Sequence, residues 1–221
     1  MKREQPDPQL HIAHDDETEK LRQWWKRNGT GIIAGVVIGI GGVGGIQGWR
    51  MYEDSQAGKA SVLYQRMLGA ATGESNDTAA ETARALVTDH GNSGYGDIAQ
   101  LMLARLALNS GDTAGARNAL NELLESTSDP VMRQVARVRL AVIALKDGDP
   151  QEIRSLARAD AGEGFTSHFQ ELLGDALVAS GDLDGAREAY QEALRGVAPD
   201  SRAGQLITAK LNMTRKGDDG E

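Results

Sequence analysis

Cysteine is absent from this sequence of 221 residues, and the absence limits its chemistry. A chain without cysteine has no disulfide, no thiolate metal ligand and no thiol nucleophile. The absence is compatible with an oxidising compartment but does not require one.

Positive charge is also in short supply. The chain has 24 Lys and Arg against 32 Asp and Glu, a net charge of −8. Its first fifty residues hold seven basic and six acidic side chains, so the remainder carries 17 basic and 26 acidic ones. A domain this acidic repels polyanions, and nucleic acid is therefore not expected as a partner.

Groups that could be activated for catalysis are scarce. His11 and His14 stand close to Asp15 and Asp16 in a spacing that could gather a metal, but a solvated tail gives such ligands no scaffold. His90 precedes Gly91, as expected at an ordinary helix end. No Ser-His-Asp set or carboxylate pair emerges. The sequence predicts no enzyme, no metal site and no cofactor.

The segment GIIAGVVIGIGGVGGIQGWR at 31–50 has two competing interpretations. Gly39, Gly41 and Gly44 fit G-x-G-x-x-G, the turn that holds a dinucleotide pyrophosphate in a soluble protein. That motif needs a strand before it and an acidic residue about 20 positions later, beside a second strand. The acidic residues nearby come too early, and no later segment resembles a buried strand. We therefore disfavour the nucleotide interpretation.

A membrane accounts for more of the same segment. Asn28 to Trp49 form 22 residues without a charge. As a helix they span about 33 Å, enough for a hydrocarbon core of about 30 Å. Trp24, Trp25 and Tyr52 flank the run, where aromatic rings favour the headgroups of the membrane lipid. The run is longer than the apolar core of a signal peptide, and no small-residue cleavage site follows.

Basic residues flank this run unequally. Lys20, Arg22, Lys26 and Arg27 come just before it, and only Arg50 comes just after. The positive-inside rule therefore predicts a single-pass protein with a cytoplasmic N-terminus. In a bacterium the rest of the chain would lie in the periplasm.

Three glycines of the run lie on one helix face. Gly31, Gly35 and Gly39 are four residues apart, a spacing that lets another helix approach closely. The alternative is a plain anchor of modest hydropathy. We favour a helix-packing role.

Alternating strand patterns are scarce after the run, and every long segment has helical periodicity. The predicted helices are 51–71, 77–89, 95–109, 113–126, 130–147, 150–159, 165–180, 183–196 and 200–213. The sequence thus predicts an all-α fold: one N-terminal transmembrane helix, then an α-solenoid of antiparallel helix pairs. The predicted layout is a flexible cytoplasmic tail, an interfacial helix, a transmembrane helix, a repeat domain and a disordered tail, at 1–14, 15–27, 28–50, 51–213 and 214–221.

A short motif recurs in the second part. It reads NSGDTAGARNAL at 109–120 and ASGDLDGAREAY at 179–190, with a degenerate copy, KDGDPQEIRSLA, at 146–157. A period near 34 residues is typical of tetratricopeptide-like repeats. Glycine is expected to end the first helix of each pair, and aspartate to cap the second.

The copies also predict where paired helices touch. Small residues are expected at the close contacts, with a larger side chain filling the next gap. Ile153 stands at a position where the second copy should have a small residue. The expected repeat-packing residues are Ala104, Gly111, Ala116, Gly174, Gly181, Ala186 and Tyr190.

These features together resemble the YfgM-type ancillary subunits of the bacterial Sec translocon. They comprise a charged tail, an aromatic pair, a glycine-rich span ending in Gly-Trp-Arg and a degenerate repeat domain. The local matches are GWRMYEDSQAGKASVLYQRML at 48–68, YGDIAQLMLARLA at 95–107, VRLAVIALKDGD at 138–149 and GEGFTSHFQELLGDALVASGDLDGAREAYQEAL at 162–194. The resemblance covers residues 15 to 213.

The resemblance implies a place and a role. It implies an inner-membrane protein whose partners are Sec translocon subunits and a periplasmic chaperone or folding factor, to which exported proteins are passed. It also implies a possible cytoplasmic regulatory role. The alternative is a generic envelope scaffold or an adaptor in cell division or envelope assembly.

Helix 131–146 is apolar on nearly every side, which usually means burial. In a solenoid, such a helix could instead expose a strip that binds unfolded client segments. The residues of this candidate client strip are Val135, Val138, Val142, Phe165 and Phe169.

Overall fold

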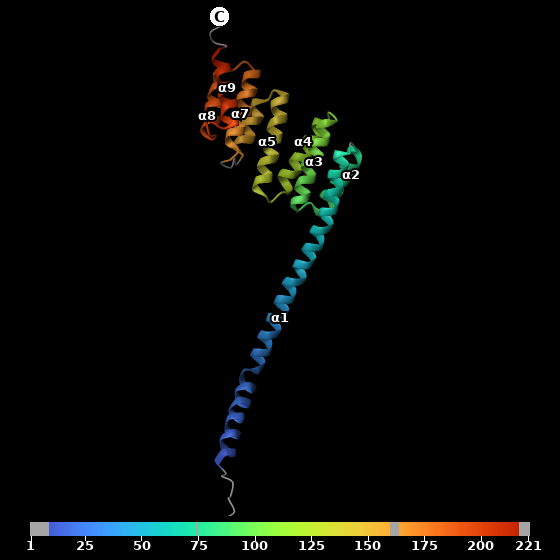
Figure 1. The fold of residues 1–221 in the computed structure, drawn as a ribbon, viewed down its shortest axis with the longest axis vertical. Helices are drawn as coiled ribbons and strands as arrows, with labels where there is room; N and C mark the ends of the chain where they lie inside the picture. The colour runs from blue at the N-terminus through green and yellow to red at the C-terminus, as the bar shows by residue number, and fades with distance from the viewer. Residues whose placement is uncertain (1–8, 74, 160–163, 217–221) are drawn as a thin grey trace, which may run out of the picture. The chain divides into compact units, whose positions relative to one another are not determined.

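A computed structural model describes the backbone of residues 9–73, 75–159 and 164–216, and the side chains of 18–73, 75–159 and 164–214. The described chain is helical and contains no strand, which confirms the predicted fold class (Figure 1). Its helices are α1 Gln9–Thr72, α2 Asn76–His90, α3 Gly94–Asn109, α4 Thr113–Ser126, α5 Pro130–Asp147, α6 Pro150–Arg158, α7 Thr166–Ala179, α8 Leu183–Arg195 and α9 Arg202–Lys216.

The first helix is longer than the sequence predicted. Separate interfacial, membrane and repeat helices were expected, whereas α1 runs without a break for 64 residues. No proline occurs between Pro8 and Pro130, so nothing forces the helix to stop at these boundaries. The helix begins within the segment predicted to be a flexible tail, whose residues 1–8 lie outside the described ones.

The chain forms two compact units, Met1–Ala57 and Gly58–Glu221. The first unit contains most of α1. The second starts seven residues after the predicted start of the repeat domain and includes the last turns of α1. At the other end, α9 extends to Lys216, three residues past the predicted end of the domain. Residues 217–221 of the predicted disordered tail lie outside the described ones.

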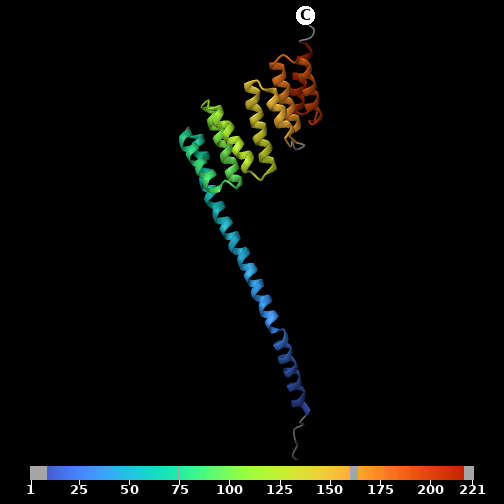
Figure 2. The same cartoon turned by 180° about the vertical axis from the view of Figure 1, so that it is seen from behind.

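The second unit is a stack of helices in chain order, as Figures 1 and 2 show from opposite sides. Each helix from α2 to α9 packs against its neighbours in the chain, and α5 also packs against α7. Contacts restricted to neighbouring repeats are the hallmark of a solenoid. Such a stack leaves long faces of its helices open to partners.

Tight turns join the two helices of each repeat. Gly111, Gly148 and Gly181 have positive φ angles of 82°, 73° and 84°. Glycine adopts this left-handed conformation without the steric cost that a Cβ would bring. The aspartate after each glycine caps the next helix: Asp112 accepts a hydrogen bond from the Gly115 amide at 2.8 Å, and Asp182 accepts one from Gly185 at 2.9 Å.

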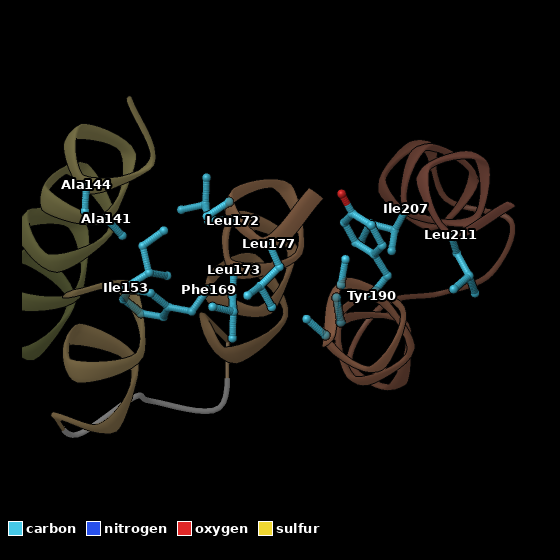
Figure 3. Packing of buried hydrophobic residues seen from close by; sticks show 14 residues of the cluster. Ala141, Ala144, Ile153, Phe169, Leu172, Leu173, Leu177, Tyr190, Ile207 and Leu211 are labelled. Carbon is cyan, nitrogen blue, oxygen red and sulfur yellow. The ribbon is translucent and has the colours of Figure 1, made fainter. Parts of the chain in front are cut away.

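Three apolar clusters form the core of this unit. The first joins the last turns of α1 to α2 and α3, the second joins α3, α4 and α5, and the third extends from α5 to α9. Figure 3 shows the third cluster, in which Ile153 and Phe169 lie between α5, α6 and α7. Ile153, the misfit of the second repeat copy, is fully buried there. The second repeat therefore accommodates the large side chain of Ile153 at a position where the repeat pattern predicts a small one.

Candidate functional site

A close helix contact in the third repeat centres on Gly174 of α7. A Cβ built on this glycine would lie 2.5 Å from a ring carbon of Tyr190 on α8. Side chains never approach this closely, so only glycine leaves room for the ring. The sequence predicted small residues where α7 and α8 meet, and it placed Ala186 there; Ala186 is fully buried.

Tyr190 lies at the centre of this contact. Its ring is almost completely buried and lies beside Ile207 of α9 (Figure 3). Its hydroxyl donates a hydrogen bond to Asp175 Oδ1 at 2.7 Å. Burial, together with this hydrogen bond, raises the pKa of Tyr190. The residue therefore packs the repeat as a neutral phenol.

The first repeat uses the same arrangement with smaller side chains. Ala104 of α3 and Ala116 of α4 are buried, and Leu120 occupies the place that Tyr190 has in the third repeat. Gly111 and Gly181 lie in the equivalent turns. All seven residues expected in repeat packing thus lie at helix contacts or helix turns.

Charged side chains connect α9 to α7. The Lys210 ammonium donates to Glu171 Oε1 and to Asp175 Oδ2, each at 2.7 Å. Burial opposes the charge, but the hydrogen bonds to Asp175 and Glu171 raise the pKa of Lys210 overall. The sequence analysis missed this pairing, because the partners lie 39 and 35 positions apart.

A second ion pair that sequence reasoning missed connects the first repeat to the next. Arg117 of α4 donates to Glu152 at 2.5 Å and to Asp147 at 2.8 Å. The hydrogen bonds to Glu152 and Asp147 raise the pKa of Arg117. One signal was available in the sequence, since each copy of the repeat motif has an arginine six residues after the turn glycine.

The candidate client strip is only partly accessible. Val142 of α5 is 46% exposed, whereas Val135, Val138 and Phe165 are half-buried. Phe169 was wrongly assigned to the strip, because it is 1% exposed and packs in the core beside Ile153. Helical periodicity misled here, since α7 is buried on the side that carries Phe169.

The glycine-rich part of α1 has a different character. Gly31, Gly35 and Gly39 have no described atom within 4 Å of a built Cβ, apart from the nearby backbone of their own helix. The stretch Thr18–Thr72 is the helix, among the described residues, that is long and apolar enough to cross a membrane, with a mean hydropathy of 1.8 in its most apolar window. The aromatic pairs Trp24–Trp25 and Trp49–Tyr52 flank the glycines.

The nucleotide interpretation of this segment is wrong. Gly39, Gly41 and Gly44 lie within α1 and not in a turn between a strand and a helix. The backbone amides inside a helix are already hydrogen-bonded and cannot hold a pyrophosphate. Among the residues whose side chains are described, no cluster of metal-ligating groups occurs; His11 and His14 lie outside that range.

A family model described as a tetratricopeptide repeat-like domain matches residues 22–216. The chain belongs to this family. The match includes the apolar part of α1 as well as residues 58–216 of the second unit, so membership in this family covers both candidate surfaces.

Three curated relatives carry the name "Ancillary SecYEG translocon subunit". The protein from Haemophilus influenzae is 27% identical over 91% of this chain and 97% of its own length. The Escherichia coli protein is 26% identical over 92% and 98%, and the Aggregatibacter actinomycetemcomitans protein is 26% identical over 91% and 97%. These relatives confirm the resemblance to the YfgM type. No solved structure matches the chain.

Proposed function

We propose that this protein is a membrane-anchored, non-catalytic interaction module that accompanies the Sec translocon. One observation carries the proposal: three relatives named as ancillary translocon subunits are similar to more than nine-tenths of the chain. The repeat fold supports it, because tetratricopeptide-like stacks offer extended faces for binding proteins.

We further propose that the N-terminus is cytoplasmic and that the repeat domain lies in the periplasm, with α1 crossing the bacterial inner membrane. Support comes from the four basic residues just before the uncharged run, against Arg50 alone just after it. A phosphatase that is active only after export, fused after Glu221, should be active. An inactive fusion at a normal protein level contradicts this orientation.

In that position the repeat domain would receive exported segments and pass them to a periplasmic chaperone or folding factor. The half-exposed Val135, Val138, Val142 and Phe165 are its proposed client contacts. A cytoplasmic regulatory role of the N-terminal segment follows only from the resemblance and remains part of the proposal.

The span itself is proposed to dock on translocon helices. Support comes from the glycine stripe, since Gly31, Gly35 and Gly39 have open space where a Cβ would stand. Leucine at these positions would hold another helix away, because close helix packing in membranes relies on small residues. The same substitution increases the hydrophobicity of the span and should favour its insertion.

These opposite effects make a sharp test. Replace Gly31, Gly35 and Gly39 with leucine, and compare copurification of SecY, SecE and SecG at matched membrane levels. The control places three leucines at Gly41, Gly44 and Gly48, which lie on a different face of the helix. Recovery should fall for the first variant and hold for the control. Equal recovery from both would remove the docking role of the stripe, and no recovery even with the wild type would favour a generic envelope scaffold.

A further inference from the structure

One arginine recurs at the same place in all three repeats. Arg117, Arg154 and Arg187 each stand six residues after a turn glycine that has positive φ. Equivalent positions in a solenoid meet equivalent surroundings in the next repeat. The three side chains should therefore meet similar partners.

Two of these arginines do have partners. Arg117 bonds to Asp147 and Glu152, which stand one residue before and four residues after the next turn glycine, Gly148. Arg187 pairs with Asp184 in its own helix and donates to the Thr214 carbonyl of α9 at 3.4 Å.

Arg154 lacks the equivalent acids. The positions that match Asp147 and Glu152 in the next repeat are Ser180 and Gly185, and neither carries a charge. Within the described part of the chain, neither Arg154 nor Arg158 makes a hydrogen bond or an ion pair. The two are four residues apart on α6 and so lie on one face of that helix.

A cleft lies beside these two arginines. It has a volume of about 300 Å³ and lies between α6 and α7. Arg154 and Arg158 line it together with the polar Thr166 and Gln170 and the apolar Ala157, Phe169 and Leu173. A lining that combines polar and apolar groups is typical of sites that fix an amphipathic ligand.

The local charge agrees with an anionic ligand. Among the described residues that line the cleft, two are basic, Arg154 and Arg158, and none is acidic. This lining favours acidic segments over basic ones.

We propose that the cleft between α6 and α7 binds a partner polypeptide at a point where a carboxylate side chain is next to an apolar one. The guanidinium groups of Arg154 and Arg158 would hold the carboxylate, because guanidinium and carboxylate match in both charge and geometry. The apolar neighbour would rest against Ala157 of α6, which lines the cleft and is only partly buried. This inference deepens the proposed interaction role by giving one binding site and the chemistry of its partner.

The test uses the full-length protein in detergent micelles and a fluorescein-labelled peptide, Gly-Ser-Leu-Glu-Leu-Ser-Gly. Fluorescence anisotropy should show binding that weakens by about tenfold or more in the double variant Arg154→Gln, Arg158→Gln. The same loss is expected when the peptide's glutamate is replaced by glutamine. The matched control is Arg139→Gln, Lys146→Gln, which removes two exposed cations of α5 that do not line the cleft.

Each outcome decides the proposal. If the α5 control variant weakens peptide binding as much as the cleft variant does, the effect is one of general charge and the proposal is overturned. The proposal is also overturned if the glutamine peptide binds as tightly as the glutamate peptide. The proposal is also overturned if the wild-type protein does not bind the peptide. Binding of inorganic phosphate, or self-association of the protein through α6, would not change that conclusion. Circular dichroism should show both double variants folded, because the changed side chains make no hydrogen bond or ion pair within the described part of the chain. A protein that fails to bind the peptide can still copurify with the translocon subunits. The proposal for the cleft and the proposal for the translocon association can therefore fail independently.

Discussion

Glycine has opposite surroundings in the two units of this protein. In the repeat domain, the ring of Tyr190 fills the space beside Gly174. A Cβ built on Gly174 would lie 2.5 Å from a carbon of that ring. In the apolar part of α1, Gly31, Gly35 and Gly39 have open space at the same place. The first glycine completes a contact within the chain, whereas the others leave a surface that no other described residue covers. The same residue type therefore builds the fold in one unit and, in our proposal, the docking surface in the other.

The largest expected effect comes from filling the packed glycine. Gly174→Leu should destabilise the repeat domain by about 1–3 kcal/mol or more, because the new side chain would overlap the Tyr190 ring. For a chain of this size, each kcal/mol lowers the Tm by about 2–4 °C. Thermal unfolding of the full-length protein in detergent micelles, followed by circular dichroism, measures the change. Gly35→Leu is the matched control and should leave the Tm unchanged; equal Tm values for the two variants would mean that α7 and α8 do not pack as described.

A smaller effect is expected at the helix cap that follows. Asp182→Ala should cost about 1 kcal/mol, because the amide of Gly185 at the start of α8 loses its hydrogen-bond acceptor. Asp184→Ala is the control, since it removes an exposed acid from the same turn whose ion pair with Arg187 contributes little. Urea unfolding of both variants tests the cap, and a control that loses as much stability as Asp182→Ala would count against it.

The smallest effect concerns high pH. Lysine in an unfolded chain has a pKa of about 10.4, and the contacts with Asp175 and Glu171 raise the pKa of Lys210 in the folded protein. This stabilisation is therefore complete below about pH 10.4 and is lost as the pH rises through the raised pKa. The raised pKa of Tyr190 acts in the same direction, because ionisation of the buried phenol also favours unfolding.

Lysine and tyrosine can be separated by substitution. Lys210→Met should flatten the fall in stability between about pH 10 and 11, by less than about 1 kcal/mol because the pair is partly solvated. Tyr190→Phe should remove the remaining pH dependence of the stability of the third repeat, because phenylalanine keeps the ring in place but cannot ionise. Unfolding curves at pH 8 and at about pH 11 measure both effects. An unchanged pH dependence in the double variant would assign the alkaline loss of stability to other groups.

Local signals in the sequence predicted much of the repeat domain. Gly181 and Asp182 end one helix and cap the next through contacts that stay within a few residues, so a short motif contains all the information. The recurrence of this motif predicted the helix pairs. The continuity of α1 was missed for a related reason, because changes of composition suggested boundaries where no residue breaks the helix.

Contacts between repeats were harder to predict. Lys210 meets Glu171 and Asp175, and Arg117 meets Asp147 and Glu152, only because of the angle at which successive helices stack. Many exposed charges could have formed such pairs, and helical periodicity does not choose among them. Phe169 shows the same limit, since an apolar helix reveals its buried face only after its neighbours are placed.

The most direct test of the central claim is photocrosslinking from the span in intact membranes. A photoreactive residue at Ile46 lies on the side of α1 that carries Gly35 and Gly39, and one at Val37 lies on the opposite side; both side chains are exposed. We expect crosslinks to a translocon subunit from position 46 and none from position 37. Equal crosslinking from the two positions, or none from either, would contradict a span that docks through its glycine face.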